Sequence, residues 1–382
     1  MSEIVKKKTF LAGFGGAGLG AAFLMANSSI GPGFLTQTSF YTEQLLTSFG
    51  FVILVSVLLD LGAQLNTWRI LTVSNMRAQD LANAVLPGLG FLVSLLIVAG
   101  GFAFNIGNIA GCGLGLNVLT GWSFETGAWV SCLFALLLFW SREIGSMLDG
   151  FTKVLGVVKI ALALFIAFAA NPPVMEAVRH TFVPEKLSIA AIITIVGGTV
   201  GGYLTFSGAH RLLDAGISGV ENLREVDKSA TRGIMISSMM RFILFLAVVG
   251  VVSSGVTLDR NNPAATVFES AAGKTGLRLF GVILWSAAIS SVVGAAYTSV
   301  SFFKTFHPSI LKYERWWISG FIIISTLVFA GIGKPKELLL LAGAVNGLIL
   351  PVALAVILIA AGRTSLMNGY RHPAWMIFSG WI

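Results

Sequence analysis

Two glycine-rich interruptions lie within long apolar stretches, one in each half of the chain. The first is Gly31-Pro32-Gly33-Phe34, and the second is Gly-Gly-Thr-Val-Gly-Gly at residues 197–202. A helix that breaks inside a membrane leaves backbone N–H and C=O groups without hydrogen-bond partners. This costs several kcal/mol per group unless the groups line a cavity or bind a ligand. Paired breaks are the typical sequence sign of a transport site built from discontinuous helices. We therefore expect the binding site at these breaks.

The residue types at the breaks suit a small organic anion. Helix N-termini present free N–H groups and partial positive charge, which favours a carboxylate, and neither break carries a fixed negative charge. Aromatic side chains suit the apolar body of such a ligand, and amide and hydroxyl groups suit its polar atoms. The predicted substrate-binding residues are Gly31, Pro32, Gly33, Phe34, Gln37, Thr199, Gly201, Gly202 and Tyr203.

The alternative is that both glycine clusters are ordinary points of close packing, since small residues are common where membrane helices touch. Gly-Pro-Gly favours a true break. Proline removes a donor and restricts the residue before it, and glycine allows the backbone to become left-handed.

Three further polar residues are candidates for binding a coupling ion. Ser290 and Ser291 offer oxygen ligands that suit a hard cation such as sodium. Asp60 lies near the centre of an apolar run, where an acid is costly to bury and is a functional candidate. Each has a structural alternative: the serines would bond within their helix or across to another, and Asp60 would pair with an arginine or a hydroxyl.

The composition places these residues in a membrane. Of 382 residues, 55% are hydrophobic and 11% are charged, and apolar runs of membrane-spanning length recur throughout. About eleven spans are predicted: 10–46, 49–71, 88–119, 126–141, 152–171, 187–218, 234–257, 277–302, 316–333, 337–362, and a start at 373 that is too short to cross. That short last run is what a truncated C-terminus would leave.

Charge distribution predicts the orientation. Most of the 25 Lys and Arg residues fall in loops on one side if the N-terminus is cytoplasmic, as the positive-inside rule requires. They are dispersed, so the net charge of +8 does not indicate nucleic-acid binding. The two cysteines, Cys112 and Cys132, lie in apolar segments and offer neither a disulfide framework nor a metal motif. We expect a multi-pass plasma (inner) membrane protein.

The breaks fall in spans 1 and 6, so ten spans divide into five plus five with the second half inverted. We expect one transmembrane domain over residues 1–382, all α-helical, with inverted repeats at approximately 10–171 and 187–362. Residues 373–382 would begin a further helix.

The sequence resembles the Nramp divalent-metal transporters, which have the leucine-transporter-like fold. Where that family has Asp-Pro-Gly-Asn in span 1, residues 31–34 read Gly-Pro-Gly-Phe, and where span 6 reads Gly-Ala-Thr-Val-Met-Pro-His, residues 197–203 read Gly-Gly-Thr-Val-Gly-Gly-Tyr. Span 8 resembles the family at residues 290–297 and span 10 at residues 346–351. The resemblance covers nearly the whole chain and implies the 5+5 fold with discontinuous helices 1 and 6.

The sequence differs from the family at the residues that bind the metal and carry the proton. Its metal ligands in spans 1 and 6 correspond here to Gly31, Phe34 and Gly201, which offer no side-chain ligand. Its proton route in span 3 uses an Asp and a Glu, and the corresponding residues are the neutral Asn105 and Asn108, which cannot exchange a proton near neutral pH.

We therefore expect an alternating-access secondary transporter that imports a small carboxylate-bearing solute, with no metal site and no cofactor beyond a sodium or proton coupling ion. The alternative is a transporter of a hydrated divalent ion such as Mg²⁺ or Mn²⁺, with Asp60 as its nearest carboxylate. No nucleophile–base pair, HExxH motif or phosphate loop indicates an enzyme. The expected partners are the solute and the lipid bilayer, and the oligomeric state is open.

Overall fold

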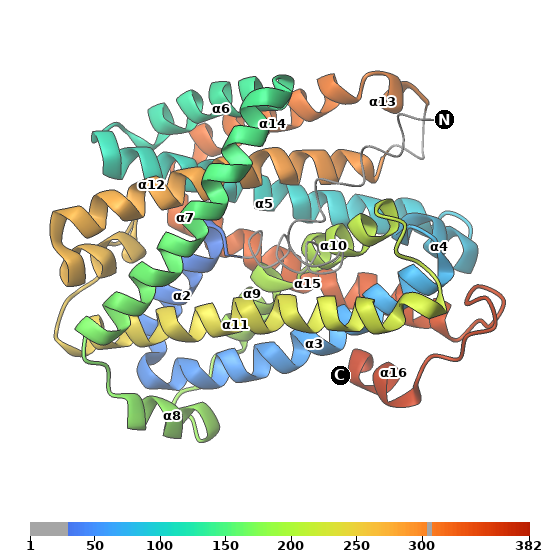
Figure 1. The fold of residues 1–382 in the computed structure, drawn as a ribbon, viewed down its shortest axis with the longest axis horizontal. Coiled ribbons are helices and arrows are strands. Elements are labelled where there is room, and N and C mark those ends of the chain that lie inside the picture. Colours follow the sequence, from blue (N-terminus) through green and yellow to red (C-terminus); the bar gives the residue numbers. More distant parts are fainter. Residues whose placement is uncertain (1–29, 304–307) are drawn as a thin grey trace.

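The protein is an assembly of long helices (Figure 1). The structure, a computed structural model, describes residues 30–303 and 308–382, without the side chains of residues 142–155 and 308. In chain order its longer α-helices are α2 (Pro32–Leu45), α3 (Phe49–Ser74), α5 (Leu89–Thr120), α6 (Phe124–Trp140), α7 (Arg142–Ala169), α9 (Ile189–Thr199), α10 (Gly202–Asp214), α11 (Leu223–Ser253), α12 (Pro263–Ser301), α14 (Glu314–Ile332) and α15 (Pro335–Ala361). The shorter elements are η2 (Leu46–Ser48), α4 (Ala78–Val85), α8 (Val174–Phe182), η3 (Val220–Asn222), α13 (Pro308–Lys312) and α16 (Ala374–Trp381).

Within the described residues, seven helical stretches are long and apolar enough to cross a membrane, or eight if the bent pair α7–α8 counts as one span. The predicted spans from 49–71 to 337–362 each coincide with a helix. Even the larger number is lower than eleven because α2 and α3 form one stretch, α6 has only 17 residues and α16 has only 8 residues. The count of eleven therefore stays a prediction, as do the two repeats.

Helix α5 lies at the centre of the packing, in contact with α4, α6, α12, α14 and α15. Helix α11 runs beside α3, and α7 crosses the long helices obliquely (Figure 1). The part of α9 before the second break packs on α15 through glycines: a side chain at Gly197 would collide with the Gly343 carbonyl, and one at Gly347 with the Ile193 carbonyl. Such contacts bring membrane helices together at backbone distance.

The last described helix, α16, begins at Ala374, close to the predicted start, and docks against α3. The buried Asn66 amide donates to the Met376 carbonyl at 2.8 Å, and His372 Nε2 lies 2.8 Å from Asn66 Oδ1. Next to them, Arg69 pairs with Asp227 at 2.6 Å. The ring of His372 is therefore held between a buried amide and a charged pair.

This contact predicts a pH effect on stability. Burial is the main reason that the pKa of His372 is lowered from 6.5 to about 4, and the charge of Arg69 contributes in the same direction. The charge of Asp227 acts in the opposite direction and raises this pKa. The unfolded chain binds this proton at a higher pH than the folded chain, so the free energy of unfolding should fall as the pH drops from about 6.5 to about 4.

Thermal unfolding of the purified protein across this pH range measures the effect. His372→Gln keeps a hydrogen-bonding group without the titration, and its stability should change less over the same window. Equal slopes for the two proteins would contradict the assignment.

Candidate functional site

The second predicted break is confirmed. Helix α9 ends at Thr199 and α10 begins at Gly202, with Val200 and Gly201 between them outside helical geometry. At the start of α10 the Tyr203 N–H donates to Asn346 Oδ1 at 3.2 Å. The same amide donates through Nδ2 to the carbonyls of Gly100 and Ala342, both at 2.9 Å. Asn346 therefore supplies hydrogen bonds that tie the break to α5 and α15.

The first break is described only on its C-terminal side. Helix α2 begins at Pro32 with Gly31 as its N-cap, and the part of span 1 before residue 30 lies outside the described residues. Pro32 packs so closely on α5 that a side chain at Gly111 would collide with it. The carbonyl of Ile30, just before the helix, accepts a hydrogen bond from Lys159 Nζ at 2.8 Å.

The glycines do not have the backbone conformation expected from the sequence. None of the described glycines at the breaks has a positive φ, and Gly31 and Gly201 have φ values of −96° and −45°. Their role is close approach: a Cβ at Gly201 would lie 2.6 Å from that of Asn346, and one at Gly198 would collide with the Gln37 amide. Close packing and a break in the helix therefore occur together at these glycines, and their part in binding stays a prediction.

A buried arginine from α11 reaches the second break. Arg241 is 3% exposed, and its Nη1 donates to Thr199 Oγ1 at 2.7 Å. Its guanidinium carbon lies 4.3 Å from the centre of the Phe34 ring, at the start of α2. Its Nε and Nη2 are buried and have no hydrogen-bond partner among the described residues. Arg241 thus links both breaks and keeps two donors unused.

Asp60 on α3 is the acid that accompanies this arginine. It is 1% exposed, and it interacts electrostatically with Arg241 without a contact that qualifies as an ion pair within 4 Å. Its Oδ1 has no hydrogen-bond partner among the described residues. Asp60 and Arg241 therefore make no close ion pair, and the predicted structural pairing of Asp60 with an arginine stays a prediction.

The structure brings some of the predicted substrate-binding residues together and separates others. Phe34 and Thr199 meet at Arg241. Gln37 donates to the Leu339 carbonyl at 2.9 Å and keeps its Oε1 unpaired and buried beside Gly198. Tyr203 instead packs on Phe104, with ring centres 5.9 Å apart.

The other two predicted coupling residues, Ser290 and Ser291, lie on α12, and the neutral positions of the family's proton route lie on α5. Ser290 Oγ donates to the Ser286 carbonyl at 3.1 Å, the within-helix bond that was its structural alternative, and Ser291 is partly buried. Asn105 Nδ2 donates to Ser325 Oγ at 3.1 Å, and Asn108 is buried. None of these contacts tests ion binding.

Sequence reasoning missed Arg241 and Lys159. Both are buried cations in apolar helices, and an ionisable residue within a membrane span is a signal of function that would have selected them. The sequence could not show which residues they contact, because each lies far along the chain from the break that it reaches.

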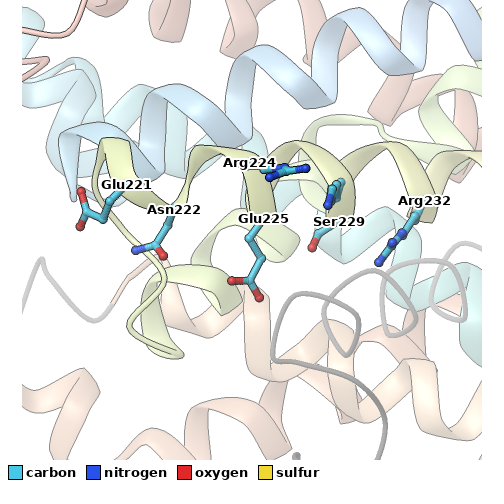
Figure 2. A pocket seen from close by; sticks show the side chains of 7 residues that line it. Glu221, Asn222, Arg224, Glu225, Ser229 and Arg232 are labelled. Atoms are coloured by element: carbon cyan, nitrogen blue, oxygen red, sulfur yellow. The ribbon is translucent and has the colours of Figure 1, made fainter.

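Two other features do not define the site. The described residues contain no group of three or more His, Cys, Asp or Glu side chains that could hold a metal ion. A surface hollow of about 390 Å³ is lined by charged and polar residues of the η3–α11 segment. Figure 2 shows these side chains. Its lining ends at Arg232, nine residues and about 14 Å along the helix axis from Arg241. We therefore place the candidate site at the breaks.

Comparison with known proteins agrees with this architecture. A family profile described as "Natural resistance-associated macrophage protein-like" (Nramp) matches residues 22–382. "Uncharacterized membrane protein YcsG" of Bacillus subtilis is 57% identical over 362 residues, covering 95% of this chain and 90% of the relative. A manganese transporter of Eremococcus coleocola aligns with a TM-score of 0.69 at 16% identity, over 96% of this chain and 83% of its own. MhsT, in complex with L-phenylalanine, aligns with a TM-score of 0.65 at 17% identity, over 95% of each chain.

The glycine contacts predict a difference between two substitutions. Gly197→Ala would drive a Cβ into the backbone of α15, and overpacking of this kind costs about 1–3 kcal/mol. Gly33→Ala meets nothing closer than Gln37 Nε2 at 3.4 Å, so it should leave the folded protein intact. Thermal unfolding and size-exclusion profiles of the two variants distinguish these outcomes. A Gly197→Ala protein as stable as the parent would show that α9 and α15 are not held at backbone distance.

Proposed function

The chain belongs to the Nramp family and is a secondary transporter with the leucine-transporter-like fold, and on that premise we propose that it carries a small carboxylate-bearing organic solute. The solute binds where α9 gives way to α10, beside the start of α2. Transport follows alternating access, with import from outside to cytoplasm. The protein is not an enzyme.

The observation that carries this proposal is the buried guanidinium of Arg241. Burying a charged group is costly unless it is paired and its donors are satisfied. Arg241 keeps Nε and Nη2 unpaired at the break. A guanidinium presents its donors as a planar fork that matches the two oxygens of a carboxylate. A solute carboxylate supplies the acceptors that the described residues do not.

Asp60 fits this role because it offsets the arginine charge without occupying the fork. The two side chains interact through space and make no close ion pair, so the guanidinium stays available. The pair is also less costly to bury in the empty carrier than a lone cation would be.

Two neighbouring features support a carboxylate. The N-terminus of α2, where Phe34 contacts Arg241, adds partial positive charge beside the guanidinium. Phe34 covers one face of the guanidinium and offers apolar surface to the body of the solute. MhsT, which has the same fold, is in complex with L-phenylalanine, an α-amino carboxylate.

The second candidate is a divalent cation, which the manganese transporter of the same fold favours. A dication prefers oxygen ligands with negative charge, and here a fixed positive charge stands at the break. We therefore place the organic acid first.

The proposal predicts that ligands are distinguished by their carboxylate. The purified protein is screened by thermal shift against acids and their matched amides: lactate and lactamide, succinate and succinamide, L-alanine and L-alaninamide, L-phenylalanine and L-phenylalaninamide. At least one acid should raise the unfolding temperature in a saturable way, because a ligand of the native state stabilises it. Its amide should bind at least about tenfold more weakly, since it loses a charge-assisted bond. Equal affinity for acid and amide would rule out the arginine fork.

Variants test Arg241 directly. Arg241→Gln should abolish the acid-dependent shift, and Arg241→Lys should retain only a weakened one because lysine lacks the fork. Removing the arginine alone leaves Asp60 buried without its counter-charge, so Asp60→Asn with Arg241→Gln provides a neutral pair that should fold and not bind. The exposed Arg232→Gln on the same helix is the matched control. Unchanged binding in the neutral double variant would refute the assignment.

For metals, we expect no saturable site of micromolar affinity for Mn²⁺, Cd²⁺ or Mg²⁺ at the breaks. Isothermal titration calorimetry of the protein with each metal measures this. A micromolar site that disappears in Asp60→Asn would favour the divalent-cation alternative over the organic acid.

A further inference from the structure

A second buried cation contacts the other break. Lys159 on α7 is 3% exposed, and its Nζ donates to the Ile30 carbonyl at 2.8 Å. Ile30 is 4% exposed and immediately precedes the N-cap of α2. The amine therefore holds the last carbonyl before the helix, at the position where the chain enters α2.

The charge of this amine has no acidic partner among the described residues. Helix α7 packs against α6, α11 and α12. The buried ionisable groups that these helices bring are Cys132 and Arg241, and the charged residues of α12 (Glu269, Lys274 and Arg278) are exposed. Among the described residues, none of them forms a hydrogen bond or an ion pair with Lys159. The strength of its bond to Ile30 therefore depends on its own protonation, because charge-assisted hydrogen bonds are about twice as strong as neutral ones.

Sodium, with Ser290 and Ser291 on α12 as oxygen ligands, is the other coupling ion that the sequence suggests. A sodium ion and an ammonium group satisfy a backbone carbonyl in the same way, with a compact positive charge. Lys159 already provides that charge from α7. A covalently attached amine cannot be exchanged with solution, but its proton can.

We propose that Lys159 is the coupling site of this transporter and that the coupling ion is a proton. In the state described, the protonated amine fixes Ile30 and the start of α2. When the carrier opens and water reaches the amine, Nζ gives one proton to a water molecule, becomes neutral and loosens its hold on the carbonyl. Proton uptake from the opposite side restores the bond. The inference rests on the chain being a secondary transporter and is independent of the carboxylate assignment.

The test needs no knowledge of the solute. Hydrogen–deuterium exchange of residues 31–45, corrected for intrinsic rates, is measured in the detergent-purified full chain between pH 6 and 9.5. Each pH is run with sodium chloride and with N-methylglucamine chloride. The variants are Lys159→Met, which removes the donor, and Lys159→Arg, which keeps the charge. Lys228→Met, at an exposed lysine, is the control.

In the parent protein, protection at the start of α2 should be equal in both salts and should decline as the pH rises. Lys159→Met should exchange at least about tenfold faster there at pH 6 and show no further pH dependence. Lys159→Arg should stay protected across the range, and Lys228→Met should behave as the parent. Protection that requires sodium, or that is independent of pH in the parent, would overturn the proposal. The parent measurement decides this even if a variant fails to fold.

A second experiment distinguishes a failure of this inference from a failure of the carboxylate proposal. Proteoliposomes with a pH-sensitive dye inside are given the acid that stabilises the protein most. Inward proton movement in the parent and none in Lys159→Met supports the coupling role. If no acid binds at all, the carboxylate proposal fails and the exchange result still decides the role of Lys159.

Discussion

The constraint on which the rest of this structure depends is the backbone that leaves helical geometry between α9 and α10 inside an apolar layer. Water cannot satisfy such groups there, so the protein must do so itself. The N–H groups of Val200 and Gly201 both donate to the Val196 carbonyl, and Asn346 accepts from the Tyr203 N–H while it donates to the carbonyls of Gly100 and Ala342. One side chain thereby joins three helices at the break, and the glycine contacts between α9 and α15 follow from the same need for close approach.

Electrostatics at the breaks complement this backbone arrangement. Helix N-termini are sites of partial positive charge, and Arg241 and Lys159 each bring a cationic side chain to a break. Among the described residues, Asp60 is the acid that accompanies Arg241. We propose that this arrangement favours an anionic solute over a divalent cation.

The comparisons show that fold and ligand chemistry can separate. The chain aligns with a manganese transporter at 16% identity and with a protein in complex with L-phenylalanine at 17% identity, at similar TM-scores. A discontinuous-helix scaffold positions helix ends at a fixed place, and side chains on the surrounding helices decide what binds. In this chain the positions that correspond to the family's metal ligands are Gly31, Phe34 and Gly201, and we propose that Phe34, Thr199 and Arg241 decide what binds instead.

The sequence by itself determined the membrane class, the position of most helices, the break at residues 197–202 and the family, because long apolar runs and glycine clusters within them are local and strong signals. It also selected Phe34 and Thr199. The tertiary structure alone placed Arg241 on Thr199 and Lys159 on Ile30, since these partners lie 42 and 129 residues apart in the chain. It likewise assigned the break glycines to close packing, because a glycine chosen for its small size and one chosen for a positive φ look the same in a sequence. Only the neighbour across the helix interface distinguishes them.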